Sequence, residues 1–135
     1  MASIVQMAQP DGGGAIDHPR PDRLVRGNPR RETWPLYETA DGVTSVGIWA
    51  CEVGMWRIVF APNKEEYFFV LEGHVRLHGP DGAAVDVRAG EGAVIPAGFE
   101  GAFEVVAPVV LMPLAPGVTG SAASVQSDDW VQPAM

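Results

Sequence analysis

The sequence predicts an all-β domain, folded as a sandwich or barrel of short antiparallel strands. The first observation is its turn content, because 16 glycines and 12 prolines interrupt the 135 residues at short intervals. The second is the pattern between these interruptions. Runs rich in β-branched and aromatic residues follow one another, and no segment after residue 32 keeps a 3.6-residue period. The length suits one domain with one hydrophobic core.

The expected strands follow in order from residue 44. Residues 44–51 (TSVGIWAC) and 55–61 (MWRIVFA) are separated by a turn at 52–54. The sequence GPDG at 79–82 predicts a tight turn, because proline presets φ and Asp-Gly tolerates positive φ. Around it, further strands are expected over 66–72, 74–78, 83–89, 92–95, 102–106 and 109–115.

The composition divides the chain into three parts. Residues 1–32 form a flexible N-terminal segment that ends in a basic arm, residues 33–115 form the β-barrel domain, and residues 116–135 form a C-terminal tail of small and polar residues. Trp130 in the tail either packs on the barrel or on a neighbour, or is exposed.

The net charge of −8 disfavours nucleic-acid binding, because an acidic body repels phosphate. The basic arm is expected to lie on an acidic barrel, its own or a partner's; its arginines are Arg20, Arg23, Arg26, Arg30 and Arg31. A homodimer is expected, since open sheets leave edges to be covered and symmetric dimers are the commonest oligomers.

The chain has no run of about 18 apolar residues, so no membrane contact is expected. The N-terminus does not read as a secretory signal. Cys51 is the single cysteine, which excludes an internal disulfide. Together these features predict a cytoplasmic location.

Two segments resemble the paired motifs of the cupin superfamily. Six residues fall in register with those motifs: Gly54, Glu66 and Gly73 with the first, and Gly90, Pro96 and Gly98 with the second. The resemblance covers roughly residues 30–115. It is strongest to the branch of small cupins that includes (S)-ureidoglycine aminohydrolase and ethanolamine-utilization cupins. It implies a double-stranded β-helix, a jelly-roll barrel with a pocket inside, and commonly a dimer.

The resemblance also implies where a metal would be held. In metal-binding cupins, two histidines and a glutamate of the first motif and one histidine of the second bind a divalent cation. The corresponding residues here are Phe60, Pro62, Glu66 and Gly101, and Val105 stands at the asparagine position of the second motif. Because a single carboxylate does not hold such an ion tightly, no metal and no other cofactor is expected.

Glu66 is the best candidate for a catalytic residue. It could serve as a general acid or base, as a hydrogen-bond anchor for a small ligand, or as a structural residue bonded to a backbone amide or to Arg57. The expected pocket is aromatic, although aromatic residues also fill cores. Its expected lining is Trp56, Phe60, Pro62, Glu66, Phe68, Gly101 and Phe103.

The histidines of this region and the cysteine are expected to be surface or core residues without a role in chemistry. Val75 and Leu77 read as core-facing, which turns His74 and His78 outward. Cys51 reads as a buried, inert thiol.

Three functions fit these observations. The first is a small cupin that binds a small organic molecule in a metal-free, aromatic-lined pocket. The second is an enzyme, either metal-dependent and similar to ureidoglycine aminohydrolase or a metal-free isomerase that uses Glu66. The third is a structural subunit without chemistry. The fold hosts many activities and does not choose among them.

Overall fold

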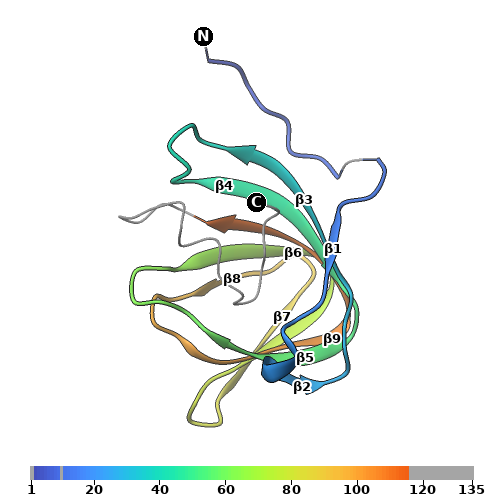
Figure 1. The fold of residues 1–135 in the computed structure, drawn as a ribbon, viewed down its shortest axis with the longest axis vertical. Coiled ribbons are helices and arrows are strands. Elements are labelled where there is room, and N and C mark those ends of the chain that lie inside the picture. The colour runs from blue at the N-terminus through green and yellow to red at the C-terminus, as the bar shows by residue number, and fades with distance from the viewer. Residues whose placement is uncertain (1, 10, 116–135) are drawn as a thin grey trace.

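A computed structural model of the chain describes residues 2–9 and 11–115, and its strands curl into a barrel (Figure 1). The all-β prediction is confirmed, since the described residues contain one short 3₁₀ turn, η1 (Pro21–Arg23), and otherwise strands. In this part of the chain, no helix has the length and apolar character needed to span a membrane. The strands are β1 (Ala15–Asp17), β2 (Leu24–Arg26), β3 (Arg31–Glu38), β4 (Ser45–Cys51), β5 (Gly54–Val59), β6 (Glu66–His78), β7 (Ala84–Arg88), β8 (Gly92–Ile95) and β9 (Glu100–Ala115).

The long strands β6 and β9 organise the barrel. Hydrogen-bonded neighbours follow the order β1-β3-β4-β9-β5-β2, while β6 pairs with β9, β7 and β8. All of these pairings are antiparallel. The C-terminal half of β9 lies between β4 and β6, and its N-terminal half lies between β5 and β6. These two strands therefore join the parts of the barrel that the shorter strands complete.

The sequence pattern divides β6 and β9 at residues that do not interrupt them. The runs 66–72 and 74–78 form one strand, and so do 102–106 and 109–115. At Gly73, where the pairing register shifts, φ is +92°. A β-carbon at Gly73 would collide with the carbonyl oxygen of Pro108 and lie 2.8 Å from Val109 Cα. The glycine permits close approach of β9 and does not end the strand.

The N-terminal segment lies on its own barrel from residue 15 onward. β1 pairs with β3, and β2 pairs with β5. Arg31, expected in a flexible arm, is buried with its guanidinium carbon 5.3 Å from the Trp56 ring centroid. The boundary expected between residues 32 and 33 falls inside β3, so residues 15–32 pack with the domain and are not a loose arm. Trp130 and the tail at 116–135 lie outside the described residues.

Large aromatic side chains fill the centre of the barrel. Trp49, Trp56, Phe68 and Phe103 are each 0% exposed. Phe103 lies at the middle of the group, with its ring centroid 5.7 Å from Trp49, 5.3 Å from Trp56 and 6.0 Å from Phe68. Such tilted and edge-to-face contacts are favourable beyond the area they bury. The aromatic cluster is thus the packed core of the fold.

Candidate functional site

Three of the residues expected to line a pocket belong to this packed core. Trp56, Phe68 and Phe103 are fully buried and touch one another through Phe103. They therefore fill the barrel centre, which is the alternative that the sequence left open for its aromatic residues. Any ligand must use side chains closer to an end of the strands.

A charged cluster lies where β5 ends and β6 begins. Lys64 Nζ lies 3.7 Å from Glu66 Oε1 and 4.8 Å from the centroid of the Phe60 ring. The side chains of Lys64 and Glu66 are each 3% exposed, and Phe60 is 2% exposed. We call Phe60, Lys64 and Glu66 the Lys64–Glu66 site.

Local structure explains how the sequence positions these groups. The peptide N–H of Phe60 donates to the carbonyl of Phe99. The carbonyl of Ala61 then accepts hydrogen bonds from the N–H groups of Lys64 and Gly98. This turn brings Lys64 back beneath Phe60, and β6 begins two residues later with Glu66 opposite Ile95. Lys64, Glu66 and Phe68 then alternate along the chain on the buried side.

The chemistry of this site is that of two opposite charges beside an aromatic face. Moving an ion from water into a protein interior costs several kcal/mol, and attraction to a partner repays this only when geometry is good. The 3.7 Å separation exceeds the length of a direct hydrogen bond between the two groups. An ammonium interacts with hydrogen-bond acceptors and a carboxylate with donors, so this pair beside the Phe60 ring has the chemistry that recognises a small polar molecule.

Sequence reasoning identified Glu66 but missed Lys64. The run NKEE at 63–66 looks like a polar turn, in which a lysine is usually solvated. The alternation of a β-strand could have identified Lys64. It lies two residues before Glu66 and four before Phe68, so all three side chains are expected on the same face. The arginine suggested as a partner, Arg57, lies on β5 and is exposed.

Two other expected pocket residues do not contribute to this site. Pro62 is exposed. Gly101 lies in β9 opposite Ile58, and a β-carbon there would collide with the carbonyl oxygen of His78 and lie 2.8 Å from the Phe99 ring. The expectation that Gly101 leaves space for a ligand is therefore wrong, because neighbouring backbone and the Phe99 ring occupy that space.

The positions that hold metal ligands in metal-binding cupins carry one carboxylate here. Phe60, Pro62 and Gly101 have no donor atom in their side chains, and Val105 is a buried core residue. Among the described residues, no three His, Cys, Asp or Glu side chains are grouped so that they could hold a metal ion. The residues present do not fit a transition-metal centre of the usual ligand set.

The two histidines of β6 face outward, as their strand parity predicts. Val75 is 0% and Leu77 is 8% exposed on the opposite side. His74 Nε2 lies 2.7 Å from Asp86 Oδ1, and His78 Nε2 lies 2.8 Å from Glu104 Oε1. Each histidine is thus part of a surface ion-pair network.

The charged partners of these histidines have perturbed acidities. Hydrogen bonds from His74 and then Arg76 lower the pKa of Asp86. At Glu104 partial burial raises the pKa, but hydrogen bonds from His78 and Arg26 outweigh it and the net shift is downward. This network stabilises the outer surface of β6, β7 and β9 and does not reach the barrel interior.

Cys51 is buried, and its thiol lies 3.2 Å from the carbonyl oxygen of Glu52. Burial strongly raises the pKa of the thiol, with Arg31 opposing this effect. A thiol held in its neutral form is a poor nucleophile, so the interpretation of Cys51 as inert agrees with its surroundings.

Comparison with known proteins identifies the fold and its family. Residues 38–110 match the family described as the EutQ-like cupin domain. No curated protein matches the sequence.

Solved structures with this architecture come from several bacteria. Clostridium difficile EutQ superposes with a TM-score of 0.60 and 22% identity over 73% of this chain and 79% of its own. A putative ethanolamine utilization protein EutQ from Salmonella typhimurium LT2 gives 0.57 and 22%, over 64% and 69%. A protein of unknown function of the DUF861 family from Pseudomonas syringae pv. tomato gives 0.66 and 17%, over 76% of this chain and 44% of its own. These similarities confirm the jelly-roll, double-stranded β-helix, and identities this low show the fold alone. The expected relation to ureidoglycine aminohydrolase stays a prediction.

Proposed function

Because this chain belongs to the EutQ-like cupin domain family, we propose that it binds a small polar organic molecule through the Lys64–Glu66 site, without a metal. The molecule is of the class that carries both an anionic group and a hydrogen-bond donor, such as a small amino acid or hydroxy acid. Its anionic group would meet the Lys64 ammonium and its donor would meet the Glu66 carboxylate. The Phe60 ring would pack against its carbon skeleton.

The observation that supports this proposal is a buried ion pair beside a largely apolar core. Both charged side chains are 3% exposed, and the core cluster around them consists of aliphatic and aromatic residues. Hydrophobic residues of similar volume are often as stable as a buried pair or more so. Stability alone therefore does not explain Lys64 and Glu66, whereas recognition of a polar ligand does.

The same residues weigh against the two alternatives. A metal-dependent enzyme would need donors where Phe60, Pro62 and Gly101 stand. In a purely structural subunit Lys64 and Glu66 would serve folding alone, and hydrophobic residues of similar volume would often do so equally well. In the present proposal Glu66 anchors the ligand, and no step in which it moves a proton is required.

Thermal denaturation in the presence of candidate ligands tests the proposal. The wild-type chain is screened against millimolar small carboxylic acids, amines, amino acids and hydroxy acids, since a ligand that binds only the native state raises the melting temperature. A compound with both groups should stabilise the wild type and Arg88→Ala, an exposed control on β7. The same compound should not stabilise Glu66→Gln or Lys64→Met. The proposal fails if no class stabilises the wild type, or if all four proteins respond equally.

A further inference from the structure

The outer side of the sheet carries a hollow between β3 and β6. Glu32 of β3 pairs with Ala50 of β4, and Ala50 pairs with Val110 of β9. Val110 pairs in turn with Glu72 of β6. Directly paired residues project from the same side of a sheet. Two small apolar side chains therefore form the floor of the hollow, and a carboxylate lies on each side of them.

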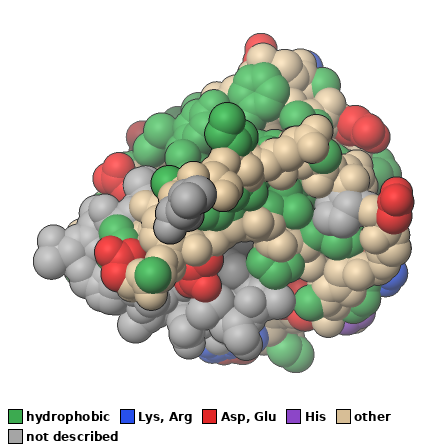
Figure 2. Space-filling view, turned by 90° about the horizontal axis from the view of Figure 1, so that it is seen from above, with side chains coloured by type: hydrophobic (Ala, Val, Ile, Leu, Met, Phe, Trp, Pro, Cys, Tyr) green, Lys and Arg blue, Asp and Glu red, His purple; other side chains and the backbone are tan. Residues whose placement is uncertain are grey.

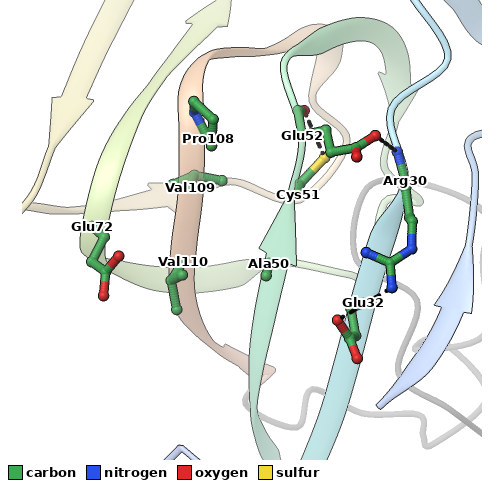
Figure 3. A pocket seen from close by; sticks show the side chains of 9 residues that line it. All are labelled: Arg30, Glu32, Ala50, Cys51, Glu52, Glu72, Pro108, Val109 and Val110. Atoms are coloured by element: carbon green, nitrogen blue, oxygen red, sulfur yellow. Dashed lines mark hydrogen bonds and ion pairs between the residues drawn. The ribbon is translucent and has the colours of Figure 1, made fainter. Parts of the chain in front are cut away.

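The hollow has a volume of about 240 Å³, and we call it the Arg30–Glu72 hollow after the two residues at its sides. Pockets for drug-sized ligands have roughly 300–1,000 Å³, so this one suits a smaller organic molecule. Its charged residues are Arg30, Glu32, Glu52 and Glu72. Figure 3 shows Arg30 beside β3 and Glu72 on β6, on opposite sides of Ala50 and Val110.

Two of the three carboxylates are already engaged within the chain. Glu32 Oε2 accepts a hydrogen bond from the Gly14 N–H at 2.7 Å, and Glu52 Oε1 accepts one from the Arg30 N–H at 2.9 Å. Glu72 is exposed, and its carboxylate has no hydrogen bond or ion pair within the part of the chain that the structure describes. This carboxylate therefore keeps its full capacity to accept hydrogen bonds from a ligand.

The guanidinium of Arg30 is accessible on the other side of the hollow. It is 50% exposed, and its Nη2 lies 3.8 Å from Glu32 Oε1. This distance exceeds the length of a hydrogen bond, so the planar donors of the guanidinium can still bind a carboxylate at two points. The hollow thus presents a hydrogen-bonding cation at one end and an anion at the other.

An irregularity in β6 turns Glu72 toward this side of the sheet. Phe68 and Val70 face the core, and the same alternation would bury the side chain at position 72. The pairing register shifts here, because β6 advances from Val70 to Glu72 while β9 moves only from Leu111 to Val110. Such a bulge re-aims a side chain, and bulges are over-represented next to active sites. The fold therefore places this carboxylate outside, where simple alternation would not.

We propose that the Arg30–Glu72 hollow binds a linear ω-amino acid, a zwitterion with an amine and a carboxylate at the two ends of a methylene chain. Its carboxylate meets Arg30 and its ammonium meets Glu72. Its methylene groups lie on Ala50 and Val110. Three strand spacings separate β3 from β6 here, roughly 14 Å. Because the long side chains at both ends shorten this gap, a chain of about three to five methylene groups with bonds of roughly 1.5 Å spans it.

The charges around the hollow favour this class of ligand. Among the residues that line it, three carboxylates surround one guanidinium, so a simple anion is repelled. A simple amine would contact Glu72 and leave Arg30 without a partner for its donors. Acidic side chains are also spread over the surface seen from above, with basic ones mainly at its edges (Figure 2), and the net charge is −8. A zwitterion has no net charge and satisfies both ends of the hollow.

The Arg30–Glu72 hollow is separate from the Lys64–Glu66 site. Lys64 and Glu66 are each 3% exposed, whereas Arg30 and Glu72 are exposed on the outer side of the sheet. Binding in the hollow therefore does not depend on the function proposed above for the buried pair.

NMR titration of the isotope-labelled full chain with γ-aminobutyrate and ε-aminocaproate tests the proposal. The amide signals of Ala50, Glu72 and Val110 should shift and saturate at millimolar ligand. Glycine, hexanoate and hexylamine should each bind at least about threefold more weakly, because none of them contacts both charges and an exposed ion pair contributes modestly. Shifts confined to Lys64 and Glu66 would place the ligand at the buried pair and overturn the proposal.

Variants with unchanged melting temperature identify the two contacts. Arg30→Ala and Glu72→Gln should each raise the dissociation constant about three- to tenfold, between the effect of an exposed ion pair and that of a hydrogen bond to a charged group. Ala50→Leu should also weaken binding, because the larger side chain fills the floor. Arg88→Ala and Glu38→Gln, at exposed positions outside the hollow, should bind like the wild type.

Three results would overturn the proposal. The first is the absence of saturable shifts at the hollow in the wild type. The second is equal binding of hexanoate or hexylamine, which would show that one charge suffices. The third is an unchanged dissociation constant in both Arg30→Ala and Glu72→Gln.

Discussion

Asp17 and Arg31 form a two-point ion pair that joins the N-terminal strand β1 to the barrel. Arg31 Nε lies 2.9 Å from Asp17 Oδ1, and Nη2 lies 2.7 Å from Oδ2. The arginine side chain is 3% exposed and the aspartate 37%. Arg31 also packs on the Trp56 ring, so this contact connects a segment before residue 20 with the centre of the core.

Removing the Asp17 carboxylate should destabilise the fold. Asp17→Ala leaves the buried guanidinium without its two charge-assisted hydrogen bonds, and we expect a loss of about 1–3 kcal/mol in the free energy of unfolding. Urea denaturation measures this free energy of unfolding. Asp22→Ala is the matched control, because Asp22 makes the same two-point contact with Arg20 at an exposed site. Equal effects of the two substitutions would contradict a special role for Asp17.

Truncation at two points should separate the dispensable residues from β1. Residues 2–6 are exposed and belong to no strand. A chain that begins at Asp11 should therefore melt within a few degrees of the full chain. A chain that begins at Arg20 loses β1 and Asp17, and should melt several degrees lower, since about 1 kcal/mol shifts the melting temperature by roughly 2–8 °C. Equal melting of the two truncated chains would instead support the flexible N-terminal segment that the composition predicts.

The Lys64–Glu66 pair should show a strong non-additive effect on stability. Lys64→Met or Glu66→Leu alone leaves a buried charge, and each should cost about 3–5 kcal/mol. The double variant Lys64→Met/Glu66→Leu should regain most of that loss or exceed the wild type. Chemical denaturation measures all four chains. A double variant that loses the sum of the two single losses would contradict energetic coupling between Lys64 and Glu66.

The purified protein should contain no stoichiometric transition metal in the barrel. Tight sites need three or four protein ligands, and the aligned positions supply Glu66 alone. Elemental analysis of protein prepared without chelator measures the content, with Glu66→Ala as the comparison. About one metal per chain that disappears in Glu66→Ala would favour the metal-dependent enzyme instead.

Glu104 should contribute to the acid sensitivity of the fold. Its pKa lies below the ordinary value of 4.5 in the folded chain. The native state therefore gains stability from the ionised group above pH 4.5, and this gain is lost as the pH falls through the lower, folded-state pKa. Below pH 4.5, the free energy of unfolding should fall less steeply for Glu104→Gln than for the wild type. Glu38→Gln, at an exposed position, is the control and should follow the wild type.

Local patterns in the sequence determined the strands, the turns and the inward or outward direction of many residues. Alternation placed Val75 and Leu77 inside and His74 and His78 outside, because successive residues of a strand point to opposite faces. The turn at GPDG was predictable from its residues, and Gly82 has φ of +86° there. The motif spacing also predicted the cupin family, since glycine and proline at those intervals reflect backbone requirements of the fold.

Only the tertiary structure decided which of these residues meet. Lys64 reaches Glu66 and Phe60 because the turn after β5 folds back under hydrogen bonds to Phe99 and Gly98, which are distant in sequence. The collision that excludes a side chain at Gly101 comes from the backbone of β6 at His78 and from the Phe99 ring. A one-residue slip of a strand would turn its apolar residues to the other side. Local sequence determines which faces a strand has, but pairing between distant strands determines what each face touches.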